Sequence, residues 1–461
     1  MIGVSGIPDA ARIAYLGLYA LQHRGQESAG IVAIDADGRA RMHRAMGLVA
    51  DAFTNATLEG LTGDTAVAHT RYSTAGSSVL ANAQPYLVNY HAGPLALAHN
   101  GSLTNSTELK DELVRTGSLF ASTVDTEVIV HLIARSNAPT VEGQIRDALE
   151  QLDGAYSLVI SVGRTIYAAV DARGFRPMVV GRLGGGLVVA SETCALDLIG
   201  ATAVRELLPG EFVRIDDGEM IDLPPLAPRR VSRCIFELVY FSRPDSTVFG
   251  ESVNAVRREL GRQIARHHAA PGADVVFSVP DSSNAMALGY SEVSGVKLEH
   301  GLIRNHYVGR TFINPVQALR VQKVKIKFNP VRDVIEGRSV VVIDDSLVRG
   351  TTSKGLVGMI RDAGAREVHL RLASPPITGP CHYGIATPTR EELIASSHSV
   401  EEIRDYLGVD SLAYLTLDEM IDATGRGSQW CHACFSGDYP TPGQLTLGQF
   451  RQTPELVALT R

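Results

Sequence analysis

The stretch RSVVVIDDSLVRGTTS, residues 338–353, carries the clearest chemical pattern in the chain. Residues 340–343 form a short apolar run that is typical of a buried strand, and Asp344 and Asp345 follow it directly. Carboxylates at the carboxyl end of a parallel strand can accept hydrogen bonds from sugar hydroxyls or hold Mg²⁺ through water. The loop around Gly350 can present N–H groups and threonine hydroxyls to a phosphate at a helix start. The whole pattern predicts a ribose phosphate site, whereas the acidic pair alone also fits an ordinary strand end before a capped helix.

A second polar turn, PDSS at residues 280–283, follows the apolar run DVVFSV. Its small residues allow the backbone to approach an anion closely, and the alternative is a plain type I turn with proline at its second position. Farther along, basic residues are interrupted by apolar ones, which fits either a lid over the anion or a solvated surface. These basic residues are Arg304, Arg310, Arg320, Lys323, Lys325 and Lys327.

The cysteines stand at positions 194, 234, 381, 431 and 434, and they are too few and too scattered for a disulfide framework in 461 residues. The last two form a Cys-x-x-Cys pair. Four thiolates can hold Zn²⁺, but a bare Cys-x-x-Cys is also compatible with two unpaired buried thiols.

The elements that must position these residues differ between the two halves of the chain. In the first half, runs such as TAVAHTRYSTAG and GGGLVVASE meet glycine turns, which indicates a strand-dominated α/β domain. From about Arg230, short Val/Ile runs alternate with helical stretches, the pattern of a parallel sheet with crossover helices. Helices are expected at residues 13–22, 108–116, 125–136, 252–268 and 352–363. The prolines of IDLPPLAPRRVSR place the seam between domains of residues 1–228 and 229–461.

The composition excludes several classes of function. A net charge of −7 and a pI near 6.1 give no electrostatic footprint for nucleic acid or for an anionic membrane surface. No apolar stretch reaches the roughly 18 residues of a membrane span, and the N-terminus has no basic region followed by an apolar run. We therefore expect a cytoplasmic enzyme that acts on small molecules.

Six ordered motifs in the second half resemble those of the glutamine phosphoribosyl diphosphate (PRPP) amidotransferase family: CIFELVYFSRPDS, SVPDSSNAMALGY, RNHYVGRTFI, VVVIDDSLVRGTTS, ELIASSHSVEEI and CHACFSGDYP. In the first half, LQHRGQESAG, HTRYSTAG, LALAHNG and DTEV are similar to the glutaminase half of that family. The resemblance covers nearly the whole chain. It implies an N-terminal Ntn-hydrolase-like α-β-β-α sandwich, a class II glutamine amidotransferase domain, followed by a type I phosphoribosyltransferase domain with a parallel sheet. It also implies a homo-oligomer.

The resemblance implies a PRPP site in which Asp344 and Asp345 are the catalytic carboxylates and contact the ribose hydroxyls. Ser282 together with this pair would hold Mg²⁺ on PRPP, and the basic run would close over the diphosphate as a lid. The implied PRPP-binding residues are Asp281, Ser282, Ser283, Asp344, Asp345, Ser346, Arg349, Gly350, Thr351 and Thr352.

The cysteines also match one branch of the family, which binds a [4Fe-4S] cluster. The matching positions are Cys234, Cys381, Cys431 and Cys434. Such a cluster would tie the start of the second domain to its C-terminal segment, so its implied role is structural. Cys194 is left over as a small core residue.

The glutaminase motif departs from the family at its nucleophile. In the family, the processed chain begins with a cysteine whose thiolate attacks the glutamine amide while the α-amine serves as base. Here IGVSGI places Ile2 at that position, and no cysteine occurs before Cys194. Ser5, the nearest hydroxyl, lies three positions farther into the expected strand. Because loss of a nucleophile costs orders of magnitude in rate, we expect an inactive or severely impaired glutaminase.

The rest of the glutamine pocket persists in the sequence. By resemblance, Arg71 and Asp125 hold the α-carboxylate and α-amine of the substrate, and Asn100 and Gly101 form the oxyanion hole. The full set of matching residues is Arg24, Gly25, Arg71, Asn100, Gly101 and Asp125. A silenced site, a site kept to bind without cleaving, and residues kept only for packing all fit this pattern.

Three functions are compatible with the sequence. The favoured one is a Mg²⁺-dependent PRPP phosphoribosyltransferase in which a nitrogen nucleophile, a nucleobase-like heterocycle, displaces diphosphate, as in amidotransferase-like enzymes of nucleoside-antibiotic pathways. The alternative is an amidophosphoribosyltransferase that forms 5-phosphoribosylamine for purine biosynthesis from free ammonia. The third is a non-catalytic regulatory subunit that binds PRPP or nucleotides. Feedback nucleotides are further expected ligands.

Overall fold

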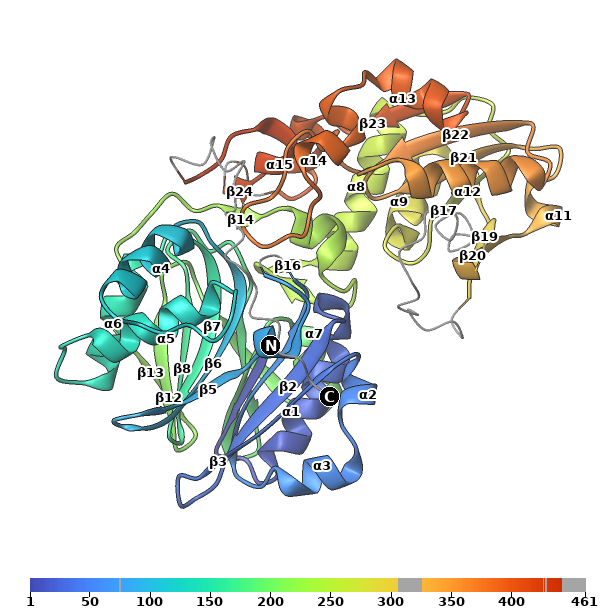
Figure 1. The fold of residues 1–461 in the computed structure, drawn as a ribbon. Coiled ribbons are helices and arrows are strands. Elements are labelled where there is room, and N and C mark those ends of the chain that lie inside the picture. The colour runs from blue at the N-terminus through green and yellow to red at the C-terminus, as the bar shows by residue number, and fades with distance from the viewer. Residues whose placement is uncertain (74–75, 306–325, 426, 428, 442–461) are drawn as a thin grey trace, which may run out of the picture.

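The computed structural model describes residues 1–73, 76–305, 326–425, 427 and 429–441. In Figure 1 an N-terminal part, coloured blue to green, lies below a C-terminal part, coloured yellow to red. The C-terminal part contains a parallel sheet, and the N-terminal part contains two stacked antiparallel sheets. The expected fold class, a layered sandwich followed by a parallel-sheet domain, is confirmed. None of the helices formed by the described residues has the length and apolar character needed to span a bilayer.

The N-terminal part is built on two antiparallel sheets. The seven-stranded sheet runs in the order β11-β9-β10-β1-β4-β2-β3 and the six-stranded sheet in the order β13-β12-β8-β7-β6-β5. The first sheet comprises β1 (Ile2–Ser5), β2 (Ser28–Ile34), β3 (Ala40–Met46), β4 (Thr65–Arg71), β9 (Val179–Leu183), β10 (Gly186–Ala190) and β11 (Thr202–Glu206). The second comprises β5 (Tyr86–Tyr90), β6 (Gly93–Leu103), β7 (Gly154–Val162), β8 (Thr165–Val170), β12 (Phe212–Asp216) and β13 (Glu219–Asp222).

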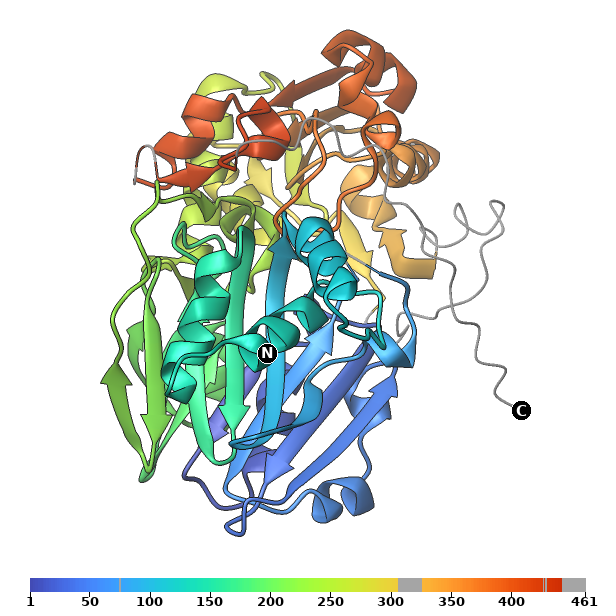
Figure 2. The ribbon, with the colours of Figure 1, turned by 60° about the vertical axis from the view of Figure 1, so that its left-hand side comes forward.

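Three apolar layers fix the order of these elements. One core lies between the sheets, where residues such as Val67 and Val159 meet. A second core joins the seven-stranded sheet to α1 (Ala10–Ala20), α2 (Val49–Ala52), α3 (Asn55–Gly60) and α7 (Thr193–Ile199). A third joins the other sheet to α4 (Ser106–Arg115), α5 (Thr126–Arg135) and α6 (Val141–Gln151), the teal helices in Figure 2. Successive side chains of each strand point to opposite faces of its sheet. Each sheet packs against a core on both faces, so its strands are buried on both sides.

The C-terminal part is built on a five-stranded parallel sheet in the order β18-β17-β21-β22-β23. Its strands are β17 (Val275–Ser278), β18 (Lys297–Leu298), β21 (Ser339–Asp344), β22 (Glu367–Leu372) and β23 (Ser411–Tyr414). The helices are α8 (Val253–His267), α9 (Asn284–Ser294), α11 (Arg332–Ile335), α12 (Thr351–Asp362), α13 (Val400–Leu407), α14 (Leu417–Asp422) and α15 (Ala433–Ser436). One core contains residues of α8 and α9, and another contains residues of α12 and α13, so helices cover both faces of the sheet.

Short strand pairs complete this part. β19 (Leu302–Arg304) pairs with β20 (Phe328–Pro330), and β15 (Thr247–Val248) pairs with β16 (Glu251–Ser252), both antiparallel. β14 (Arg233–Cys234) pairs in parallel with β24 (Trp430–Cys431), which brings the start of the C-terminal part to its end. The 3-10 helices cover Gln22–Arg24, Leu80–Asn82, Arg390–Glu392 and Ile394–Ser396, and a π-helical turn covers Glu237–Phe241.

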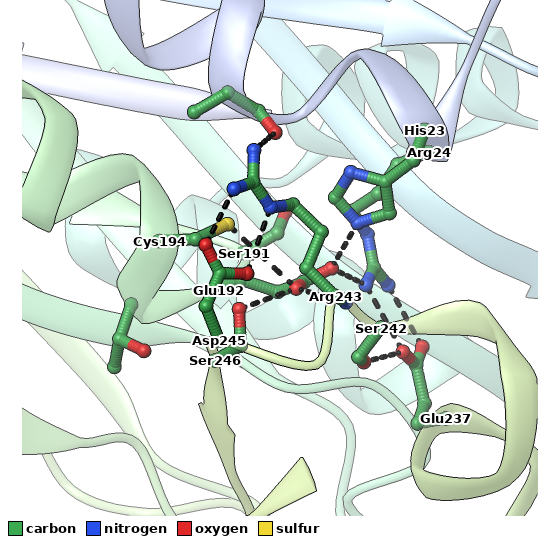
Figure 3. A network of polar contacts seen from close by, with 12 residues as sticks. His23, Arg24, Ser191, Glu192, Cys194, Glu237, Ser242, Arg243, Asp245 and Ser246 are labelled. Atoms are coloured by element: carbon green, nitrogen blue, oxygen red, sulfur yellow. Dashed lines mark hydrogen bonds and ion pairs between the residues drawn. The ribbon is translucent and has the colours of Figure 1, made fainter. Parts of the chain in front are cut away.

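A buried ion cluster joins the two parts. Arg24 Nη1 lies 2.5 Å from Glu192 Oε1, and its Nη2 lies 2.7 Å from Glu237 Oε1. Arg176 donates to the same Glu237 oxygen at 2.8 Å. His23 Nε2 contacts Glu192 Oε1 at 2.6 Å. The close-up in Figure 3 shows Arg24 between the two carboxylates, so one guanidinium from the N-terminal part bridges an acid of each part.

The remaining carboxylate oxygens of the cluster are also satisfied. Ser242 Oγ donates to Glu237 at 2.6 Å, while Ser246 Oγ and the Arg243 backbone N–H donate to Glu192 at 2.7 and 2.9 Å (Figure 3). Burial is the largest single influence on both glutamates and opposes their charged form, but Arg24 and the other cationic and hydrogen-bonding partners together outweigh it, so the pKa of each carboxyl lies below its usual value. The cluster is therefore ionised and fully hydrogen-bonded at its acids, the condition under which a buried ion pair is tolerated.

We expect Glu237→Gln to lower the free energy of unfolding by about 3–5 kcal/mol, because it leaves the buried Arg24 and Arg176 short of a counter-charge. The measurement is urea denaturation followed by intrinsic fluorescence. Glu259→Gln is the matched control, since Glu259 pairs with arginines at the surface and its loss should cost no more than about 1 kcal/mol. Equal losses for the two variants would contradict the prediction.

The same cluster predicts acid sensitivity. Because the folded-state pKa of Glu192 and Glu237 lies below the ordinary glutamate value of 4.5, their ion pairs stabilise the fold above that pH. This contribution is lost as the pH falls below 4.5 toward the lowered folded-state values. The midpoint temperature of thermal unfolding should therefore fall more steeply on acidification for the unmodified chain than for Glu237→Gln. If the midpoint temperature changed with pH in the same way for the two proteins, the cluster would not govern acid stability.

Candidate functional site

The predicted carboxylate pair lies at the carboxyl end of the parallel sheet. β17 and β21 run side by side, with Ser278 opposite Ile343, so the turns that follow them meet at one edge. Ser282 Oγ donates to Asp345 at 2.5 Å, and Ser283 Oγ donates to Asp344 at 3.4 Å. The structure thus brings together the two polar motifs that the sequence separates by about 60 residues.

Burial raises the pKa of both carboxyls in this pair, and the charge of Asp345 adds to the increase at Asp344. Two buried acids without a cation therefore resist ionisation together. A divalent cation would relieve this repulsion. Among the described residues, no three His, Cys, Asp or Glu side chains converge as ligands of a single metal ion. Mg²⁺ is commonly held by one or two carboxylates plus substrate oxygens, so this donor set fits Mg²⁺ only in company with a phosphorylated ligand.

The loop after the carboxylates leads into α12. Gly350 has a φ of +73° and directly precedes the helix, which supports its expected place in a tight anion-binding turn. Ser346 Oγ donates to Asp345 at 2.6 Å, and the exposed Thr351 and Thr352 form the first turn of the helix. Arg349 instead contacts a carboxylate, that of Glu392, at 3.1 Å.

The remaining PRPP motif residues lie on the turn after β17. Asp281 forms an ion pair with Arg304 at the end of β19. Of the basic run, Arg304 and Lys327 are in the described part of the chain, and the Lys327 ammonium lies 5.0 Å from the centre of the Phe328 ring. Arg310, Arg320, Lys323 and Lys325 lie outside the described residues.

A cavity, which we call the N-terminal pocket, lies at the end of the sandwich nearest the C-terminal part. Its volume is about 50 Å³. It is lined by Arg24, His69, Thr70, Arg71, Tyr72, Gln84, His99, Asn100, Gly101, Val124, Asp125, Thr126, Arg176, Phe241 and Gly384. Five of the predicted remnant residues, namely Arg24, Arg71, Asn100, Gly101 and Asp125, therefore share one cavity.

Hydrogen bonds hold the polar wall of this pocket in place. Asn100 Oδ1 lies 3.1 Å from His69 Nε2, and its Nδ2 donates to Ser191 Oγ at 2.9 Å. The same Ser191 oxygen accepts from the Met1 α-amine at 3.1 Å. Asp125 accepts from the Leu103 backbone N–H at 2.9 Å. Burial lowers the pKa of His69 well below its usual range, so this wall carries a neutral imidazole.

Ile2 and Gly25 are not among the residues that line the pocket. Ile2 pairs with Ala68 and Ala190 in β1, is fully buried, and fills the space beside Gly17 of α1. A Cβ at Gly17 would lie 2.2 Å from Ile2 Cδ1. The residue at the nucleophile position is thus part of the hydrophobic core. Ser5 is also buried in β1.

The four cysteines of the predicted cluster face one another. Cys234, Cys381, Cys431 and Cys434 all line a further cavity of about 20 Å³, the cysteine cavity, whose other walls are mainly apolar. The Tyr383 backbone N–H donates to Cys381 Sγ at 3.3 Å. Four thiols around one cavity are a donor set that either Zn²⁺ or an iron–sulfur cluster could use, so the choice between them stays a prediction. Cys194 lies apart in the core beside Glu192, as expected.

Sequence reasoning missed the ion cluster and part of the pocket. Glu237 stands alone in the apolar run CIFELVYF, and a lone acid in such a run signals a buried, paired charge. Arg176 and Glu192 carry no such local signal, because the oppositely charged residues that they pair with lie more than 50 residues away. The approach of Gly384 to the pocket was also unforeseen.

The chain is similar to known proteins over nearly its full length. A family model described as a glutamine amidotransferase domain matches residues 69–198. Amidophosphoribosyltransferase 2, chloroplastic, of Arabidopsis thaliana is 50% identical over 445 residues, which is 95% of this chain and 79% of that protein. The amidophosphoribosyltransferase of Bacillus subtilis is 48% identical over 447 residues, which is 96% of this chain and 94% of that protein.

A solved structure is also similar to this chain over nearly its full length. The glutamine PRPP amidotransferase from B. subtilis, complexed with ADP and GMP, is 48% identical and matches with a TM-score of 0.89 over 95% of this chain and 97% of that chain. Identity at this level over both domains establishes the fold and the enzyme class, that of the pentosyltransferases. The chain belongs to the amidophosphoribosyltransferase family.

Proposed function

We propose that the chain is a Mg²⁺-dependent phosphoribosyltransferase that displaces diphosphate from PRPP with a nitrogen nucleophile it does not obtain from glutamine. The observation that carries the second half of this proposal is the buried Ile2 at the nucleophile position. The intact carboxylate pair and Gly350 turn support the first half. The family membership is consistent with both domains being retained while one chemistry is lost.

The chemistry of the transferase site follows from its charges. As diphosphate leaves, positive charge develops on the ribose, and the carboxylates of Asp344 and Asp345 at the strand end stabilise it while they hold the ribose hydroxyls. The turn at Gly350 and the N-terminus of α12 bind the 5′-phosphate. The Arg349–Glu392 pair is half-exposed, so exchange of Glu392 for a phosphate costs Arg349 little. When bound, Mg²⁺ neutralises the charge of the diphosphate; its ligands would be Ser282, Asp344 and Asp345.

We propose a nucleobase-like heterocycle as the acceptor. A chain without a glutaminase nucleophile has no internal source of ammonia, so its acceptor must enter from solution with its own nitrogen. Free ammonia, giving 5-phosphoribosylamine, is the second candidate, and the names of the relatives favour it. The [4Fe-4S] cluster on the four cysteines, nucleotide effectors like the ADP and GMP of the B. subtilis complex, and a homo-oligomer belong to the same proposal.

The acceptor can be identified by measuring diphosphate release from PRPP and Mg²⁺ with glutamine, ammonium, or single purine and deazapurine bases. We expect release with a base and only background with glutamine, because Ile2 has no nucleophilic atom. If ammonium supports diphosphate release and none of the bases does, the acceptor is ammonia and not a nucleobase. Glutamate formed in step with diphosphate would overturn the loss of the glutaminase.

Asp344→Asn and Asp345→Asn should each lower kcat/KM for PRPP on the order of 10²- to 10³-fold, since each removes a charge aimed at the reacting centre. Asp362→Asn is the matched control, because Asp362 is exposed at the far end of α12, and it should leave kcat/KM unchanged. Full activity in both site variants would show that Asp344 and Asp345 are not the catalytic carboxylates.

A further inference from the structure

The N-terminal pocket and the cysteine cavity share a segment of chain. Residues 381–384, which we call the bridging loop, begin at Cys381 and end at Gly384. Cys381 and Tyr383 line the cysteine cavity, whereas Gly384 lines the N-terminal pocket. A shift of this loop therefore changes both cavities at once.

The end of the bridging loop at the pocket, Gly384, packs tightly against the backbone of Gly101. Gly384 has a φ of +97°, and a Cβ there would lie 2.8 Å from both Cα and the carbonyl carbon of Gly101. Gly101 lines the pocket as part of the predicted oxyanion hole. The backbone of the loop is thus in direct contact with the backbone that a ligand in the pocket would touch.

Arg176 holds the middle of the bridging loop. Its Nε and Nη2 donate to the Tyr383 carbonyl at 3.2 and 2.9 Å, and its Nη1 donates to Glu237 at 2.8 Å. The Tyr383 ring stacks on Phe175 with centroids 4.3 Å apart. Since Arg176 also lines the pocket, the same side chain contacts the pocket, the bridging loop and the ion cluster.

A second cysteine is connected to the pocket by a separate path. The Cys234 backbone N–H donates to the Phe175 carbonyl at 3.2 Å. Three residues later, Glu237 accepts from Arg24, which Figure 3 shows at the centre of the ion cluster and which also lines the pocket. Two of the four cysteines therefore lie within three residues of groups that form or hold the pocket wall.

We propose that an uncleaved α-amino acid amide, L-glutamine, binds in the N-terminal pocket and stabilises the four-cysteine cluster through the bridging loop and Arg176. This inference rests on the proposed loss of glutamine cleavage and on the proposed cluster. A ligand that persists, rather than one that turns over, can act as a lasting structural link. The N-terminal pocket thus serves as a sensor of amino-acid nitrogen that controls the lifetime of the cluster.

The walls of the pocket suit this class of ligand. The Arg71 guanidinium and the Asp125 carboxylate are groups of opposite charge in one small cavity, as the two charged α-substituents of an amino acid require. His69 is one of the lining residues, and within the described part of the chain its buried Nδ1 has no hydrogen-bond partner. The side-chain amide would face Asn100 and Gly101.

The coupling must be reciprocal, because it is a difference in binding free energy between two sites. If the cluster-loaded chain binds glutamine more tightly than the cluster-free chain, then glutamine stabilises the bound cluster by the same factor in affinity; this equality holds for the two binding equilibria and not for the rate of cluster loss. Couplings of this kind amount to about fivefold or more in affinity. This sets the size of the effect that the experiment must resolve.

The experiment uses the full chain purified without air. Glutamine binding is measured by calorimetry before and after removal of the cluster, and loss of the iron–sulfur absorbance to an iron chelator is timed with and without L-glutamine. We expect glutamine to bind about fivefold or more weakly to the cluster-free chain than to the loaded chain, and to slow the loss of the cluster from the loaded chain. L-Glutamate serves as the ligand control, because it lacks the amide.

Gly384→Ala tests the proposed path. The added methyl group meets the Gly101 backbone, so we expect weaker glutamine binding and no protection of the cluster by glutamine. Gly408→Ala is the matched control, since Gly408 has a φ of +73° but open space around its Cβ position, and it should keep both properties. Thermal unfolding of both variants reports any general loss of stability.

Several results would overturn the inference. These are an absence of iron and sulfide from the purified chain, an absence of glutamine binding, and glutamine binding with an unchanged rate of cluster loss. Protection that persists in Gly384→Ala would overturn the proposed path. None of these results bears on diphosphate release from PRPP, which is measured separately and tests the proposed function.

Discussion

The buried cluster of Glu192, Glu237, Arg24 and Arg176 is the constraint on which the arrangement of the two parts depends. Charges removed from water are stable only when every partner is in place, so each member fixes the backbone that carries it. Arg24 and Arg176 thereby form one wall of the N-terminal pocket, and Glu237 fixes the first turn of the C-terminal part. A rotation of one part against the other would expose or unpair these charges.

The cluster also orients the helix that follows it. Arg257 of α8 is almost fully buried and donates to the carbonyls of Leu238 and Ser242, at 3.0 and 2.7 Å. Ser242 in turn donates to Glu237. A continuous set of polar contacts therefore runs from the N-terminal pocket into a helix of the main C-terminal core. The N-terminal pocket and the main C-terminal core are thus joined by direct polar contacts.

The sequence predicts the transferase site better than the pocket for a physical reason. In a parallel sheet, a residue at a strand's carboxyl end occupies the ligand-binding edge whatever the rest of the chain does, so IDDS and PDSS predict the contacts of Asp345 and Ser282. The expected helices at 108–116, 252–268 and 352–363 agree with α4, α8 and α12 to within two residues, because their apolar periodicity and caps are local.

Other features depend on contacts that no local pattern encodes. The partners of Glu192 and Arg176 come from distant strands and loops, and the contact of Gly384 with Gly101 joins residues of different domains. The position of Ile2 in the hydrophobic core depends on where α1 packs, which the IGVSGI motif does not reveal. The resemblance to a family supplied the remnant residues, and the fold alone supplied the ion cluster that encloses them.

The pairing of β14 with β24 has a consequence for the order of folding. Cys234 lies opposite Cys431, so the first strand of the C-terminal part gains its partner only from the end of that part. Contacts so distant in sequence form late, because loop closure must precede them. During synthesis the N-terminal sandwich can be complete while Cys234 and Glu237 still await the segment that covers them. The junction between the two parts can therefore close only after Trp430 and Cys431 have been made.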